Sequence, residues 1–148
     1  MRLGEYAVVD GRTYRARFGT QGLDLVVDEP ATATPEVRYD ERYGWWREVG
    51  WSVVEEAYRI EVWARAPGRW VVEVDALDDD GEHASVTHFD HWQDRAPFDR
   101  GDEPPGRPPY LDYQYYNGYA QGTVPIGDLT DVREVRRDVA LPDRSAER

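Results

Sequence analysis

Residues 122–135 read GTVPIGDLTDVREV, and residues 47–60 read REVGWSVVEEAYRI. The two stretches can be aligned by placing Val49 opposite Val124. Apolar residues then face each other at three further pairs of positions: 51 and 126, 54 and 129, and 60 and 135. Positions 56 and 131 both hold an acidic residue. A short break followed by alternating apolar residues is typical of a turn that leads into a strand. The chain therefore carries two copies of one element, and this repeat governs the expected fold.

The flanking sequence corresponds as well. A hairpin that opens on Gly-Arg precedes each copy, at residues 10–27 and 67–86, and an irregular Pro-rich stretch follows each hairpin. An aromatic segment then leads into the repeated element, as RYDERYGWW at residues 38–46 and as YLDYQYYNGY at residues 110–119.

These correspondences predict two small units in tandem that pack together. The first covers 1–60, the second covers 61–142 with a long Pro-rich loop at 93–109, and 143–148 form a flexible tail.

The expected fold is mainly β. Asp10-Gly11 is a strong two-residue hairpin signal, and Tyr58, Ile60 and Val62 alternate with charged or polar residues. Each unit should contain a three-stranded meander, a loop, an aromatic strand, a short turn and a last strand. Residues 132–141 fit either a strand or a helix, and we favour the strand.

The element around Gly122, Val124 and Pro125, with a short turn that ends near Leu129 or Val132, resembles the segment before the last strand of SH3-like domains. This resemblance implies two antiparallel SH3-like barrels. The first unit departs from the pattern, because Gly50 stands where the second unit has its proline. The resemblance therefore implies a fold and no ligand site.

A second resemblance covers most of the chain. GEYAVVDGRTYRA, followed by WWREV and then VEEAYRIEVWA, is similar to small proteins of actinobacteria, some of which are immunity partners of secreted toxins. The resemblance implies an immunity protein that masks a toxin.

Charge is unevenly distributed. The net charge is −12, and residues 73–103 hold eleven Asp and Glu against two Arg. Such a field repels nucleic acid and anionic lipid and accelerates association with a basic protein. The alternative is that the charge serves only solubility.

Several chemistries are excluded by composition. The chain has no Cys and no Lys, so thiol catalysis, Cys-zinc sites, Schiff bases and a phosphate-loop lysine are ruled out. No serine lies in a Gly-x-Ser-x-Gly setting. No cofactor is expected, and the lack of an apolar leader or span predicts a cytoplasmic protein.

Aromatic side chains exceed what one small core can bury, and Tyr combines rigid contact area with a polar group. We therefore expect partner binding by aromatic residues together with three acids of the DDDG turn. The candidates are Trp45, Trp46, Tyr113, Tyr115, Tyr116, Tyr119, Asp78, Asp79 and Asp80. The alternative is structural, because strand alternation would bury half of these rings.

His88, Asp90 and His91 are weaker candidates for a metal site. On a strand, His83 and His88 point to opposite faces, and only His88 and Asp90 share a side, so His91 would join them only if the strand ended there. Exposed or partly packed histidines are the expected alternative.

The sequence thus predicts a non-enzymatic, acidic protein-binding module with a basic partner, such as a toxin. The alternative is a small-molecule or carbohydrate binder or hydrolase that uses carboxylates in a cleft between the units.

Overall fold

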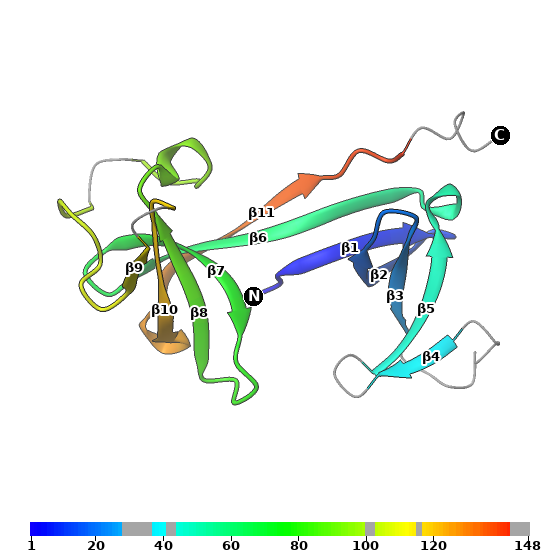
Figure 1. Ribbon diagram of the computed structural model, residues 1–148, viewed down its shortest axis with the longest axis horizontal. Coiled ribbons are helices and arrows are strands. Elements are labelled where there is room, and N and C mark those ends of the chain that lie inside the picture. Colours follow the sequence, from blue (N-terminus) through cyan, green and yellow to red (C-terminus); the bar gives the residue numbers. More distant parts are fainter. Residues whose placement is uncertain (28–36, 41–43, 100–102, 115–116, 143–148) are drawn as a thin grey trace. The chain divides into compact units, whose positions relative to one another are not determined.

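In the computed structural model (Figure 1), strands and short connections make up the chain over residues 1–27, 37–40, 44–99, 103–114 and 117–142, which are the residues that the structure describes. The fold is mainly β, as predicted, and the helical segments in these ranges are single 3-10 turns of three residues. No helix in these ranges is long and apolar enough to cross a membrane.

The chain forms two compact units, and each includes one end of the chain. The N-terminal unit comprises Gly4–Ile60 and Arg136–Arg148, and the central unit comprises Met1–Leu3 and Glu61–Val135. Segments distant in sequence therefore join within each unit.

The N-terminal unit has the strand order β4-β5-β3-β2-β1-β6, with neighbouring strands antiparallel. Its elements are β1 (Gly4–Val9), β2 (Arg12–Phe18), β3 (Gly22–Val27), β4 (Val37–Asp40), β5 (Gly44–Gly50), the 3-10 turn η2 (Trp51–Val53) and the first half of β6 (Glu56–Ala66).

The central unit has the corresponding order β9-β10-β8-β7-β6-β11. Its elements are the second half of β6, β7 (Trp70–Leu77), β8 (His83–Phe89), the 3-10 turn η3 (Trp92–Asp94), β9 (Asp112–Gln114), β10 (Tyr119–Pro125), the 3-10 turn η5 (Ile126–Asp128) and β11 (Thr130–Asp138). Strand β6 thus belongs to both orders: it is the last strand of the N-terminal order, and in the central order it lies between β7 and β11.

The repeated sequence element forms a 3-10 turn in both places. Turn η2 and turn η5 occupy the positions that the alignment of Val49 with Val124 matches. Each turn ends in the same way, because the backbone N–H of Val54 donates to the carbonyl oxygen of Trp51 at 3.1 Å and that of Leu129 donates to Ile126 at 3.1 Å.

Two details of the predicted order are settled by the strands. Residues 130–138 are a strand, so the choice of strand over helix for 132–141 is confirmed as far as Asp138, and residues 139–141 lie beyond the end of the strand. Each aromatic segment was expected to be one strand, and this was wrong: each forms a hairpin, β4–β5 and β9–β10. The added strands β4 and β9 are short and lie at the ends of the two strand orders.

The predicted hairpin turns are present. Asp10 and Gly11 have φ of 52° and 73°, the left-handed conformation that a two-residue hairpin loop requires. In the corresponding β6–β7 turn the left-handed residues are Gly68 and Arg69, with φ of 86° and 70°.

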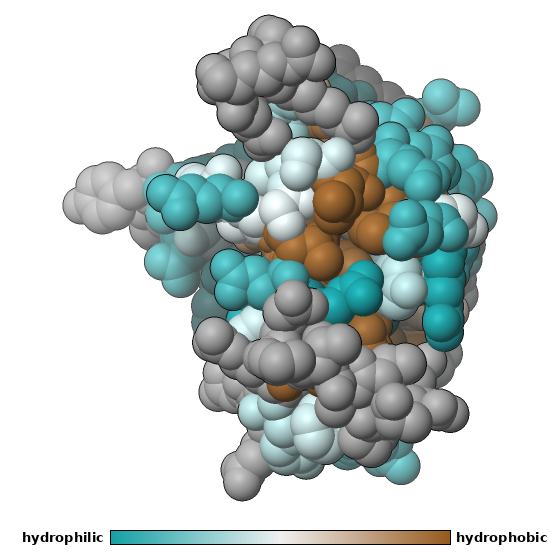
Figure 2. Space-filling model, turned by 90° about the vertical axis from the view of Figure 1, so that its right-hand side faces the viewer, coloured by the Kyte–Doolittle hydropathy of each residue, from teal (hydrophilic) through white to brown (hydrophobic). Residues whose placement is uncertain are grey.

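The core of the N-terminal unit gathers around Trp51, whose indole N–H donates to the carbonyl oxygen of Gly19 at 3.0 Å. Val139 and Leu141 pack against this core from the far end of the sequence. Its buried members are Ala7, Val9, Leu23, Leu25, Trp51, Val54 and Ala57. Figure 2 views the N-terminal unit from the side where β5 lies, and apolar side chains gather there between polar ones.

The core of the central unit contains the fully buried Trp63, with Val71, Trp92 and Phe98. Trp92 and Phe98 come from the irregular stretch after β8, so this stretch is anchored by its own aromatic side chains. Burying rings of this size contributes a large share of the stability of so small a unit.

Candidate functional site

An open depression of about 560 Å³ lies in the central unit, where β8 ends and the Pro-rich stretch returns over it. Strand β8 delivers His88, and the turn that follows delivers Asp90 and Trp92. The full lining is His88, Asp90, Trp92, Gln93, Glu103, Pro104, Gly106 and Arg107, and we call this the His88 depression.

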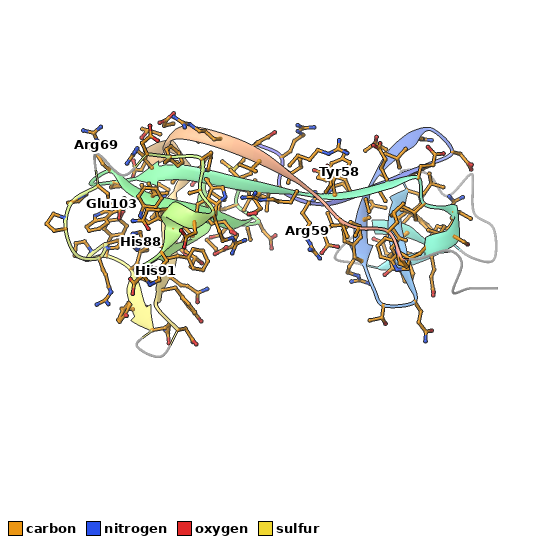
Figure 3. The ribbon with its side chains drawn as sticks, turned by 90° about the horizontal axis from the view of Figure 1, so that it is seen from above. Tyr58, Arg59, Arg69, His88, His91 and Glu103 are labelled. Atoms are coloured by element: carbon orange, nitrogen blue, oxygen red, sulfur yellow. The ribbon has the colours of Figure 1, made fainter. Side chains whose placement is uncertain are left out.

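His88 lies at the inner wall of this depression and is only 2% exposed. Its Nε2 is 3.1 Å from the Oε1 of Glu103, and Figure 3 shows the two side chains next to each other. The centres of the His88 and Trp70 rings lie 5.4 Å apart, and the two rings are nearly perpendicular. The Nδ1 atom is buried and has no hydrogen-bond partner among the described residues. Since a carboxylate only accepts, the proton of the neutral ring belongs on Nε2.

Glu103 is the centre of the hydrogen bonding. Its Oε1 also accepts the indole N–H of Trp92 at 2.9 Å, and its Oε2 accepts the backbone N–H of Val71 at 2.8 Å. One carboxylate therefore fixes the Pro-rich stretch to β7, β8 and η3. Charged acceptors form the stronger class of hydrogen bond, and this arrangement leaves few alternative conformations.

Three side chains at the outer wall contact one another: Asp90, Arg107 and Tyr113. Arg107 contacts the Asp90 carboxylate at 3.3 and 3.4 Å and donates to the Tyr113 hydroxyl at 2.7 Å, and its guanidinium lies 3.5 Å from the Tyr113 ring centre. Burial favours the protonated form of Asp90, but the hydrogen bonds from Arg107 and Tyr113 outweigh it and lower the pKa of Asp90. Asp90 is thus an anion at neutral pH.

The structure brings His88 and Asp90 to the same depression. His91 is exposed and lines a neighbouring depression with Phe89 and Asn117. Full burial of His88 differs from the expectation of exposed or partly packed histidines, because Glu103 of the Pro-rich stretch and Trp70 lie against its ring.

The candidate partner-binding aromatics are half-buried where the structure describes them. This holds for Trp45, Trp46, Tyr113 and Tyr119, whereas Tyr115 and Tyr116 lie outside the described residues. Trp45 packs at 5.2 Å against Tyr39, which is 61% exposed.

Tyr110 is a further exposed ring of the tyrosine segment. Its hydroxyl donates to the carbonyl oxygen of Pro67 at 2.7 Å, and burial raises the pKa of Tyr110 to about 12. The ring therefore fastens the segment to the β6–β7 turn.

The acidic candidates form a well-defined turn between β7 and β8, which we call the acidic turn (Asp78–Glu82). Asp80 accepts the backbone N–H of Glu82 at 2.8 Å and of His83 at 3.2 Å, and it contacts the Nδ1 of His83 at 2.9 Å. These hydrogen bonds lower the pKa of Asp80, and the bond from the Glu82 N–H has the largest effect. The hydrogen bond with Asp80 in turn raises the pKa of His83. Asp79, Asp80 and Glu82 are exposed on this turn.

Sequence reasoning missed Glu103, Arg107 and Trp92. Glu103 is one of 30 acids in a stretch without periodicity, so nothing in the sequence singles it out. A weak signal existed in Trp92, since a large aromatic residue in an irregular Pro-rich stretch indicates a core anchor.

No protein-family model matches this chain, and comparison with curated proteins and with solved structures gave no significant match.

Proposed function

We propose that this protein is an acidic binding module that recognises a basic protein surface. The observation that carries the proposal is the acidic turn, where Asp79, Asp80 and Glu82 are exposed on a turn whose backbone is fixed by Asp80. A fixed cluster of charge loses little conformational entropy on binding and steers the approach of a partner.

The charge of the central unit supports this proposal. It holds 16 Asp and Glu against seven Arg, whereas the N-terminal unit holds 14 against 11. Three quarters of the net charge of −12 therefore belongs to the unit that presents the acidic turn.

We further propose that each unit is an SH3-like barrel. In support, each has a three-stranded meander, a fourth long strand, a 3-10 turn and a last strand that pairs with the first. The additional edge strands β4 and β9 and the sharing of β6 are departures from a simple tandem pair.

The partner that suits such a module is a toxin with a basic active surface, which an immunity protein in the cytoplasm would cover. The resemblance to actinobacterial immunity proteins and the charge of the acidic turn support this partner. Electrostatic steering favours it, because a protective protein must bind before the toxin acts.

The test is an affinity capture from the native host with the wild-type chain and with the triple variant Asp79→Asn, Asp80→Asn and Glu82→Gln. The variant should lose a basic partner that the wild type captures, and the association rate should fall about tenfold at low salt. A matched control, Asp112→Asn with Asp128→Asn and Glu48→Gln, removes the same charge at other exposed positions. Equal capture by both variants, or capture that is insensitive to salt, would refute the proposal.

A second candidate function is the binding of a small polar ligand, such as a carbohydrate, in the His88 depression. Asp90, Gln93 and Arg107 supply polar groups there, and the cavity of about 560 Å³ has the size of a ligand site. A thermal-shift screen of sugars against the wild type and Arg107→Gln tests it. A sugar that stabilises only the wild type supports this function.

A further inference from the structure

A second pocket of the central unit has the opposite charge. Its volume is about 420 Å³, and it lies between the β6–β7 turn, the segment after η3 and the start of β11. Its lining is Arg65, Arg69, Phe98, Asp99, Thr130, Asp131 and Arg133, and we call it the Arg65 pocket. Three of the seven arginines of a unit with net charge −9 thus meet in one place.

The pocket is built around Phe98, which is 8% exposed. The guanidinium carbon of Arg65 lies 5.0 Å from the centre of the Phe98 ring, and that of Arg133 lies 4.3 Å from it. One buried ring therefore fixes two cationic side chains, and both keep a defined position without a ligand.

Arg65 lacks a counter-ion among the residues that the structure describes, although the chain is rich in acids. Its side chain is half-buried, and its Nη1 donates to the carbonyl oxygen of Arg69 at 2.9 Å. Arg133, by contrast, pairs with Asp131 at 3.2 Å and donates to the carbonyl oxygen of Pro97. A partly buried charge without a counter-ion is costly, and an anion that enters the pocket would offset that cost.

The backbone of the same pocket is strained. Arg69 and Asp131 have φ of 70° and 53°, and Asp10 is the other non-glycine residue with positive φ in the described ranges. Asp10 and Arg69 both lie in hairpin turns, which favour this conformation, and Asp tolerates it well. Arg does so at a cost, and strain of this kind gathers at functional sites. Figure 3 shows Arg69 projecting from the β6–β7 turn, at the rim of the pocket.

We propose that the Arg65 pocket binds the carboxylate of a small organic acid. Three arginines face Asp99 and Asp131, so the pocket has an excess of one positive charge, which one carboxylate neutralises. The planar fork of a guanidinium matches a carboxylate with two parallel hydrogen bonds. A phosphate dianion would leave the pocket negative within an acidic unit, so a carboxylate is preferred.

The experiment is a titration of the full chain with benzoate, acetate and phosphate at constant ionic strength, followed by the NMR signals of the arginine Nε–H groups. Benzoate should bind saturably and shift the Arg65 signal, and phosphate should bind several-fold more weakly. The variant Arg65→Gln should weaken benzoate about tenfold, whereas Arg12→Gln, an exposed arginine of the N-terminal unit, should leave it unchanged.

Two further variants keep the test decisive if Arg65→Gln does not fold. Arg65→Lys retains the charge but not the fork, and it should still weaken benzoate binding several-fold. Glycine adopts a positive φ without strain, so the Arg69→Gly protein should have a higher melting temperature but bind benzoate more weakly. Its control is Asp10→Gly, in the corresponding turn, which should leave benzoate binding unchanged. Failure of benzoate to saturate, or phosphate binding as tight as benzoate binding, overturns the proposal.

Discussion

The carboxylate of Glu103 lies 3.1 Å from the Nε2 of His88, fifteen residues away in sequence, and the same oxygen accepts the indole N–H of Trp92 at 2.9 Å. His88 and Trp92 are each 2% exposed, so their ring N–H groups depend on this carboxylate as their acceptor. This relationship makes the Pro-rich stretch a fixed part of the central unit.

Replacing Glu103 should therefore destabilise the protein strongly. Glu103→Ala leaves two buried donors and the N–H of Val71 without an acceptor, and we expect a loss of about 3 kcal/mol in the free energy of unfolding. Glu103→Gln keeps an acceptor oxygen and should lose less. Urea denaturation measures both, and Glu82→Ala, at an exposed acid, is the control, expected within about 0.5 kcal/mol of wild type. Equal effects at positions 82 and 103 would contradict the anchoring role.

The pair Asp80 and His83 should make stability depend on pH on both sides of neutrality. Asp80 has a lowered pKa, so its contribution is present above its ordinary value of 3.8 and is lost as the pH falls through the folded-state value. His83 has a raised pKa, so its contribution is complete below 6.5 and is lost as the pH rises through the folded-state value.

Both contributions are thus complete between pH 3.8 and pH 6.5. His83→Gln should lower the melting temperature more at pH 5.5 than at pH 9, which thermal unfolding at a series of pH values will measure. His91→Gln, at an exposed histidine, is the matched control. A His83→Gln deficit that is constant from pH 5 to pH 9 would rule out this linkage.

Asp90 and Arg107 should be energetically coupled. A double-mutant cycle of Asp90→Asn and Arg107→Gln isolates their interaction from the other effects of each change. Because Asp90 is partly shielded and Arg107 is close to half-exposed, we expect a coupling of about 0.5–1 kcal/mol. In the Asp90→Asn background, Arg107→Gln should cost less in urea denaturation than it does in the wild type, and the remaining cost reflects the contacts of Arg107 with Tyr113. Full additivity of the two changes would show that the pair contributes nothing.

Two glycines of the sheets should differ in their tolerance of alanine. A Cβ at Gly22 would lie 2.6 Å from the carbonyl oxygen of Val49, whereas one at Gly122 would lie 2.7 Å from the Cδ2 of Leu111. A ladder carbonyl cannot move without disturbing β3 and β5, but a leucine side chain can rotate. We expect Gly22→Ala to cost about 3 kcal/mol and Gly122→Ala about 1 kcal/mol, compared by urea denaturation. The reverse order would show that the β3–β5 ladder yields more readily than Leu111.

The two corresponding turns could be recognised in the sequence because each rests on a local pattern. Val54 and Leu129 each end a 3-10 turn, and short turns of this kind leave apolar spacings that alignment detects. Asp10-Gly11 has a backbone preference of its own, so its hairpin could be predicted without any tertiary contact. A strand over 132–141 was predicted from the alternation of Val135, Val139 and Leu141, and of these only Val135 lies in the observed strand, Thr130–Asp138.

The candidate site was much harder to predict from the sequence. Glu103 and His88 meet only because an irregular stretch folds back over β8, and irregular stretches carry no period from which a contact can be inferred. The split of each aromatic segment into two strands also depends on tertiary pairing, since Tyr39 and Trp45 belong to different strands of one hairpin. The left-handed conformation of Arg69 contradicts its own preference and could be found only in the structure.

Residues 1–3 belong to the central unit and residues 136–148 to the N-terminal unit, and this has a consequence for dividing the protein into fragments. Cutting the coding sequence at residue 60 gives a first fragment without Val139 and Leu141, which pack on its core, and a second fragment without Arg2, which pairs with Glu134. Neither fragment holds all the segments of one compact unit, so neither is a natural choice for a minimal folded domain. The two fragments together hold every segment, which makes residue 60 a position for a split reporter whose signal depends on reassembly.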